Sequence, residues 1–182
     1  EDFLKENIWK YNLIYLSGHS QISKTTDKQS HIGIRLANNS IISPDIFAEI
    51  DLTNCFLFYL NSCESLFPLI SINDNSIISS LLKSGVKNIA GNIINVHNKP
   101  ASIMGISIIE NISKGLSIGD AIRNARLKII KEFGYGELVW LSLTFYGDPE
   151  WKMIIKINRL KWIAAICTVI LFIGLVFTVI YK

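Results

Sequence analysis

Cysteine and histidine are scarce in this sequence, with three of each among its 182 residues. So few cysteines form no disulfide framework, and the pattern fits a reducing compartment in which a thiol stays free. The cysteines and histidines also lack the spacing of zinc ligands, so we expect neither a metal nor another cofactor.

A strong excess of charge is also missing. The net charge is +3 and the basic residues are scattered, which argues against a nucleic-acid partner. The sequence has no internal repeat, no low-complexity tract and no charged-then-apolar signal peptide at its start. A hydrophobic content of 49% is enough for a buried core, and the length fits one domain of ordinary size.

Short apolar runs alternate with amphipathic segments along the chain. Strands are predicted at 11–16, 54–60, 86–94 and 140–146, and a hairpin joins 32–36 to 41–42. Helices are predicted at 44–50, 76–83, 100–115 and 118–133, and polar loops at 20–31 and 66–75. This alternation predicts an α/β sandwich around a mostly parallel sheet.

The last twenty residues before the C-terminal lysine, 162–181, carry no charge. A helix of that length spans roughly 30 Å, the hydrocarbon thickness of a bilayer. Trp162 and Tyr181 lie at its ends, where interfacial aromatics belong, and basic residues precede it. We therefore predict a domain at 1–155, a basic linker at 156–161 and a transmembrane helix at 162–181, with the domain facing the cytoplasm. A buried core helix is the alternative.

Two strand-like runs end at residues that suggest nucleophilic chemistry. The first leads into Ser17-Gly18-His19, and the second leads into Asn61-Ser62-Cys63. Ligands and catalytic groups gather at the carboxyl ends of parallel strands, so His19 and Cys63 are expected at one edge. A histidine beside a cysteine raises its thiolate fraction, and the backbone N–H groups of Ser20 and Cys63 are candidate oxyanion donors.

Each of these residues also has a structural interpretation. A lone cysteine after an apolar strand is usually a buried small hydrophobe, and a lone histidine is usually structural. Cys55 is predicted to be core, and Cys167 to face lipid or a packed neighbour. His31 and His97 are predicted to lie on the surface.

Five segments together resemble the CHAT family, the caspase-like cysteine peptidases of the caspase–gingipain–separase clan. They are Leu16-Ser17-Gly18-His19-Ser20, Leu60-Asn61-Ser62-Cys63-Glu64-Ser65, residues 82–91, residues 119–125, and Phe145-Tyr146-Gly147-Asp148-Pro149-Glu150-Trp151. The resemblance covers about 12–151 and implies a caspase-like three-layer sandwich, with His19 as general base and Cys63 as nucleophile.

The sequence departs from the family pattern in two places. Ser20 stands where the family usually has glycine directly after the histidine. The chain also has no room for the strands that precede the histidine strand in a caspase-like fold, so we expect them upstream of Glu1 or from another chain. Glu64, Asp148 and Asp45 are possible neighbours of the substrate groove that would favour a basic side chain, or they lie in solvated turns.

The sequence therefore predicts a membrane-anchored cysteine endopeptidase that acts on a protein substrate and is activated by a partner, an upstream sensor or oligomerisation. The resemblance adds defence against phage as a role and a gasdermin-like pore former as a candidate substrate. Two alternatives stay open: a non-catalytic CHAT-like scaffold at the membrane, and a packing platform for oligomers. Cleavage-site preference does not follow from the sequence, because no basic residue can be assigned to an acid-selective pocket.

Overall fold

The computed structural model describes residues 6–24, 30–35, 39, 41–66 and 76–153, and only the backbone at 21–24 and 30–32. The predicted linker 156–161, the predicted transmembrane segment 162–181 and nearly all of the predicted loop 66–75 lie outside these ranges. Within them, no helix is both long enough and apolar enough to cross a bilayer.

Strands and helices alternate along the described chain. The strands are β1 (Leu13–Ser17), β2 (His19–Lys24), β3 (Ser30–Arg35), β4 (Ile41–Ile42), β5 (Leu57–Asn61), β6 (Ile89–Asn92) and β7 (Leu143–Tyr146). The helices are α2 (Pro44–Ala48), α3 (Ile77–Lys83), α4 (Asn98–Ser113), α5 (Ile118–Phe133) and α6 (Val139–Ser142), with a 3-10 turn, η1, at Ile8–Lys10.

The main sheet has the strand order β1-β5-β6-β7. β1 pairs parallel with β5, and β5 pairs parallel with β6, whereas β7 runs antiparallel to β6. The prediction of a mostly parallel sheet is confirmed. In the register of β1 and β5, Ser17 lies opposite Asn61, so the two strands end at the same level.

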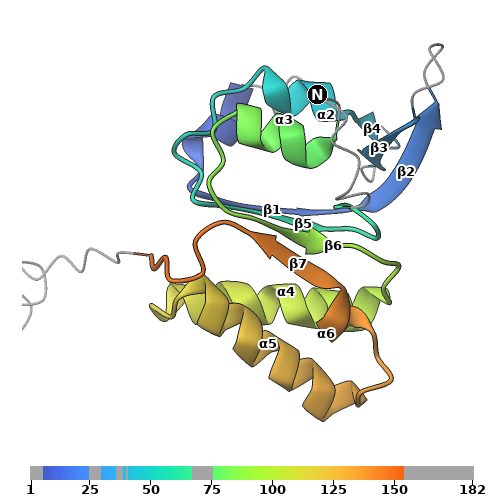
Figure 1. The fold of residues 1–182 in the computed structure, drawn as a ribbon, viewed down its shortest axis with the longest axis vertical. Coiled ribbons are helices and arrows are strands. Elements are labelled where there is room, and N and C mark those ends of the chain that lie inside the picture. The colour runs from blue at the N-terminus through green and yellow to red at the C-terminus, as the bar shows by residue number, and fades with distance from the viewer. Residues whose placement is uncertain (1–5, 25–29, 36–38, 40, 67–75, 154–182) are drawn as a thin grey trace, which may run out of the picture.

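Helices cover both faces of this sheet, which makes three layers (Figure 1). The side chains of β5 alternate between the two faces. Phe58 and Leu60 join the core that contains α2 and α3, while Leu57 and Tyr59 join the core that contains α4 and α5. Because β5 is buried on both sides, its sequence is a continuous apolar run rather than an alternating one.

The predicted loop 20–31 is wrong in part. β2 and β3 form an antiparallel hairpin over His19–Lys24 and Ser30–Arg35, and β4 extends this second sheet. The polar composition of the segment concealed the strands, because backbone hydrogen bonds form a ladder whatever the side chains are. The predicted hairpin between residues 32–36 and 41–42 is confirmed.

Local signals located most helix ends correctly. The Ser76 hydroxyl accepts a hydrogen bond from Ser79 N, and the Ser117 hydroxyl accepts one from Asp120 N, as N-caps do. The strand predicted at 140–146 begins only at Leu143, because residues 139–142 form the short helix α6.

Gly147 ends β7 in a conformation that needs glycine. Its φ is 127°, and a Cβ there would collide with Asn88 Oδ1, which accepts a hydrogen bond from Asp148 N at 2.8 Å. The same Asn88 side chain donates to Phe56 O at 2.7 Å, so it links segments next to three strands of the main sheet.

We expect Gly147→Ala to lower the free energy of unfolding by about 2–3 kcal/mol, through backbone strain and displacement of Asn88. Gly136→Ala is the matched control, since a Cβ at Gly136 meets no heavy atom within 4 Å. Urea unfolding of both variants measures the difference, and equal stabilities would contradict the expectation.

Candidate active site

A cleft of about 300 Å³ opens where β1 and β5 end. The hydroxyl of Ser17 donates to Asn61 O at 3.4 Å, which ties the two strand ends together. The residues lining the cleft come from both strand ends, from β3 and from the start of α4: Ser17, Gly18, His19, Arg35, Asn61, Ser62, Cys63, Val96, Asn98, Ala101 and Ser102.

His19 is the first residue of β2 and is exposed. It follows Gly18, where a Cβ would lie 2.8 Å from Arg35 O and 2.9 Å from Ile34 Cγ2. A side chain at residue 18 would therefore push the start of β2 away from β3. Glycine lets the chain pass directly from the main sheet into the hairpin, which leaves His19 at the cleft.

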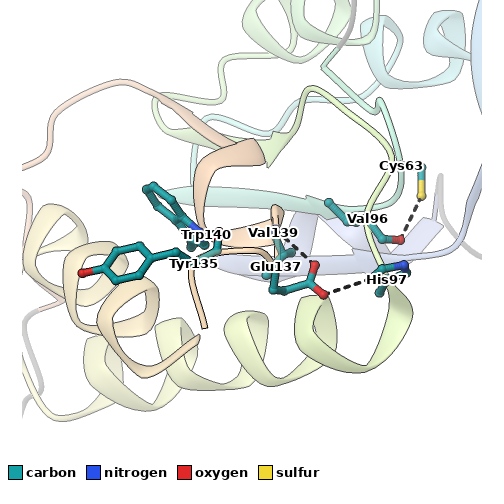
Figure 2. A network of polar contacts seen from close by, with 7 residues as sticks. All are labelled: Cys63, Val96, His97, Tyr135, Glu137, Val139 and Trp140. Carbon is teal, nitrogen blue, oxygen red and sulfur yellow. Dashed lines mark hydrogen bonds and ion pairs between the residues drawn. The ribbon is translucent and has the colours of Figure 1, made fainter. Parts of the chain in front are cut away.

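Cys63 lies on the turn that follows β5 and is partly buried. Its thiol donates to the carbonyl of Val96, with Sγ 3.6 Å from the oxygen (Figure 2). Glu64, the next residue, has a φ of 50°, a conformation uncommon outside glycine. Among the described residues, no acceptor meets the backbone N–H of Cys63 and no hydrogen bond joins His19 to Cys63.

The turn packs closely on β6 at Gly91. A Cβ at Gly91 would lie 2.9 Å from Ser65 Oγ and 2.7 Å from Leu66 Cγ. Any larger residue would lift the turn and shift Cys63 with it.

The other predicted site residues lie outside the lining of the cleft. Ser20 is within β2, opposite Ile34. The Glu64 carboxylate accepts a hydrogen bond from Asn95 Nδ2 at 3.2 Å. Asp148 Oδ1 accepts one from Glu150 N at 2.9 Å, in the turn after β7.

Asn92 is the hub of a buried polar network beneath the Cys63 turn. It is 1% exposed, and its amide nitrogen lies 3.4 Å from Asn61 Oδ1 and 3.5 Å from Ser62 O. Its amide oxygen accepts from Ser142 Oγ at 2.9 Å, and its backbone N–H donates to Ser65 Oγ at 3.2 Å. One side chain therefore connects β5, the Cys63 turn and α6.

Tyr15 extends this network to β1. Asn61 Nδ2 donates to the Tyr15 hydroxyl at 2.6 Å. The Tyr15 ring packs edge-on against Tyr59 and lies against Gly105 of α4, where a Cβ would meet it at 2.8 Å. The strand ends are thus fixed by packing as well as by hydrogen bonds.

The electrostatics of the cleft come from residues that the sequence did not reveal. Arg35 is exposed and lies opposite His19 in the β2–β3 register. It pairs with no carboxylate among the described residues, and no aspartate or glutamate lines the cleft. The start of α4, with no acid in its first turn, contributes the positive end of a helix dipole.

The remaining cysteines and histidines have other surroundings. Cys55 is 1% exposed, as predicted for core, and burial raises the pKa of its thiol to about 12. His97 is exposed, as predicted, but its Nδ1 lies 2.9 Å from Glu137 Oε2 (Figure 2). Cys167 and the His31 side chain are outside the described part. No group of three potential metal ligands occurs within that part.

Ser62 and Asn92 should respond oppositely to truncation. The Ser62 hydroxyl is buried without a partner among the described residues, so Ser62→Ala should raise stability by up to about 1 kcal/mol. Asn92→Ala removes the partner of the Asn61 amide oxygen and one of the two acceptors of the Ser142 hydroxyl, and should cost about 2–3 kcal/mol. Thermal unfolding of both variants tests this, and a destabilised Ser62→Ala protein would contradict it.

The model of the CHAT domain family matches residues 1–148, which is most of the chain and includes both His19 and Cys63. A search of curated proteins found no match. The family is associated with caspase-like cysteine peptidases and also contains inactive members. With its α/β sandwich and a family match across this range, the chain belongs to the CHAT domain family.

Proposed function

We propose that this protein is a caspase-like cysteine endopeptidase in which Cys63 is the nucleophile and His19 the general base. The observation that supports it is the cleft at the ends of β1 and β5, because His19 and Cys63 both line it. His19 lies two residues after Ser17, the end of β1, and Cys63 lies two residues after Asn61, the end of β5. Ser17 and Asn61 are paired in the register of the two strands.

The proposed reaction has two halves. His19 takes the proton from Cys63 Sγ, and the sulfur bonds to the carbonyl carbon of the scissile peptide. The backbone N–H of Cys63 and one from residues 18–20 stabilise the oxyanion. The C–N bond then breaks as His19 returns the proton to the leaving amine. A water, deprotonated by His19, hydrolyses the thioester and restores the thiol.

We extend the proposal to the location of the enzyme, from the sequence of residues 162–181, and to its regulation, from the resemblance to the CHAT family. We place the enzyme at a membrane through residues 162–181, with the catalytic domain in the cytoplasm on the side of the basic flank. At the membrane, a partner or sensor activates cleavage of a protein substrate. The biological role is defence against phage, and a gasdermin-like pore former is a candidate substrate.

A non-catalytic interaction module is the second candidate, and one contact favours it. The Cys63 thiol donates to Val96 O at 3.6 Å rather than to His19. A domain that used Cys63 only for packing would show the same contact.

The proposed endopeptidase function predicts that Cys63→Ala and His19→Ala each reduce peptide cleavage by about 10³-fold or more while the fold persists. Cleavage of a peptide library by the full chain in lipid nanodiscs measures this, with circular dichroism as the check on folding. Ser113→Ala, an exposed change at the end of α4, is the control. Undiminished cleavage by Cys63→Ala would exclude the proposed nucleophile.

The charge of the cleft predicts a preference for an acidic side chain near the scissile bond. Arg35 is its cation, and no carboxylate in the lining competes with an acidic substrate. We expect Arg35→Gln to reduce kcat/KM about 10–100-fold for an acidic peptide and little for its neutral isostere, since a lost charge-assisted hydrogen bond costs about 1.5–3 kcal/mol.

Arg123→Gln removes an exposed arginine from α5, outside the cleft, and is the matched control. Paired peptides that differ only in Glu against Gln give the ratio for each variant. The same Glu-to-Gln ratio in the wild type and in Arg35→Gln would contradict the assigned preference.

A further inference from the structure

We propose that His97 and Glu137 are positioning residues that hold the Cys63 thiol against Val96 and so restrain it from pairing with His19. The inference deepens the proposed function, because it assigns a restraint to the same nucleophile. Its measurement is the chemical reactivity of a thiol, which does not require peptide cleavage.

The first observation is the acceptor of the Cys63 thiol. Val96 O, 3.6 Å from Sγ, is a carbonyl oxygen and can only accept a hydrogen bond. The contact therefore exists only while the sulfur carries its proton, and a thiolate in the same place would face a carbonyl oxygen without a donor. For Cys63 to attack, either the sulfur turns away from Val96 or the Val96 carbonyl moves.

The second observation is how Val96 is fixed. It directly precedes His97, the N-cap residue of α4, whose carbonyl accepts the helical hydrogen bond from Ala101 N at 3.1 Å. Val96 therefore cannot move far unless the start of α4 or the His97 backbone moves.

The third observation is a contact between the start of α4 and the start of α6. His97 Nδ1 lies 2.9 Å from Glu137 Oε2, and Glu137 Oε1 accepts from Val139 N at 3.4 Å (Figure 2). The Glu137 side chain is 12% exposed, whereas that of His97 is 83% exposed. A mostly buried carboxylate thus holds an exposed imidazole next to Val96.

α6 is a firm anchor for this contact. Its last residue, Ser142, donates to the buried Asn92 at 2.9 Å, and Ser142 O accepts from Ile93 N at 3.0 Å. The chain of contacts runs from the Asn92 network through α6 and Glu137 to His97, and then to Val96 and the thiol. Breaking the exposed His97 contact loosens Val96 while the Asn92 network stays intact.

The test is the alkylation rate of each cysteine by iodoacetamide in the folded full chain, resolved by peptide mass spectrometry. His97→Gln and Glu137→Gln should each raise the Cys63 rate about three- to tenfold, the effect of losing one modest hydrogen-bond restraint. Glu132→Gln, an exposed change near the end of α5, should leave the Cys63 rate at the wild-type value. His97→Lys supplies another hydrogen-bond donor for Glu137 and should stay near wild type.

Cys55 is the internal control for unfolding, because it is 1% exposed in the core. A faster Cys63 reaction with an unchanged Cys55 reaction supports the proposal. An unchanged or slower Cys63 reaction overturns it. A parallel rise at Cys55 also overturns it, because the pair would then act only through global stability.

Adding His19→Ala separates this inference from the proposed function. Suppose that His19→Ala slows Cys63 alkylation, whereas His97→Gln and Glu137→Gln leave the Cys63 rate unchanged. The His19–Cys63 dyad then stands and the positioning role is overturned. If His97→Gln and Glu137→Gln accelerate Cys63 alkylation while His19→Ala has no effect on it, the positioning role stands and the dyad is contradicted.

Discussion

The parallel pairing of β1 with β5 is the constraint on which the candidate site depends. Since Ser17 and Asn61 lie opposite each other at the strand ends, the next residues of both segments emerge at one edge. A shift of one residue would turn the apolar side chains of β5 toward the wrong cores, so burial on both faces fixes the register. The position of Cys63 relative to His19 is therefore a consequence of core packing, and only its last adjustment depends on polar contacts.

Those polar contacts form a layer beneath the cleft. They explain why the buried residues in this layer are asparagines and serines, whose side chains carry amide and hydroxyl groups. The backbone leaves the ladder at the end of each strand and needs other partners. Asn92 supplies several of them, bonding to Asn61, Ser62 O, Ser65 Oγ and Ser142. The packing of Tyr15 against Gly105 then places α4 at the same edge. The wall of the cleft and the support of the Cys63 turn are thus one structure.

What could be predicted from the sequence is what local chemistry determines. Apolar runs located β1 and β5, and the predicted helices at 76–83 and 118–133 correspond to α3 and α5, which Ser76 and Ser117 cap. Features that depend on pairing between distant segments could not be predicted. Arg35 reaches the cleft only because β3 lies beside β2, and that hairpin was concealed by polar side chains whose backbone still forms a ladder. Likewise, Glu137 meets His97 across 40 residues, and no local pattern marks either as a partner.

The strength of the Cys63–Val96 contact bears on both proposed functions. A thiol is a weak hydrogen-bond donor, so this contact contributes little compared with the core that holds the turn. The fold therefore fixes where Cys63 lies. Turning its sulfur away from Val96 costs only about 1 kcal/mol, the free energy of one modest hydrogen bond. In the proposed enzyme, the Cys63 thiol therefore keeps this contact without distorting the sheet. The thiol also leaves this contact without distorting the sheet, because only a rotation about its own side-chain bond or a small displacement of the Val96 carbonyl is needed. The thiol–carbonyl contact therefore fits both proposals, either a packing role for Cys63 or the resting position of an enzyme whose activation is local.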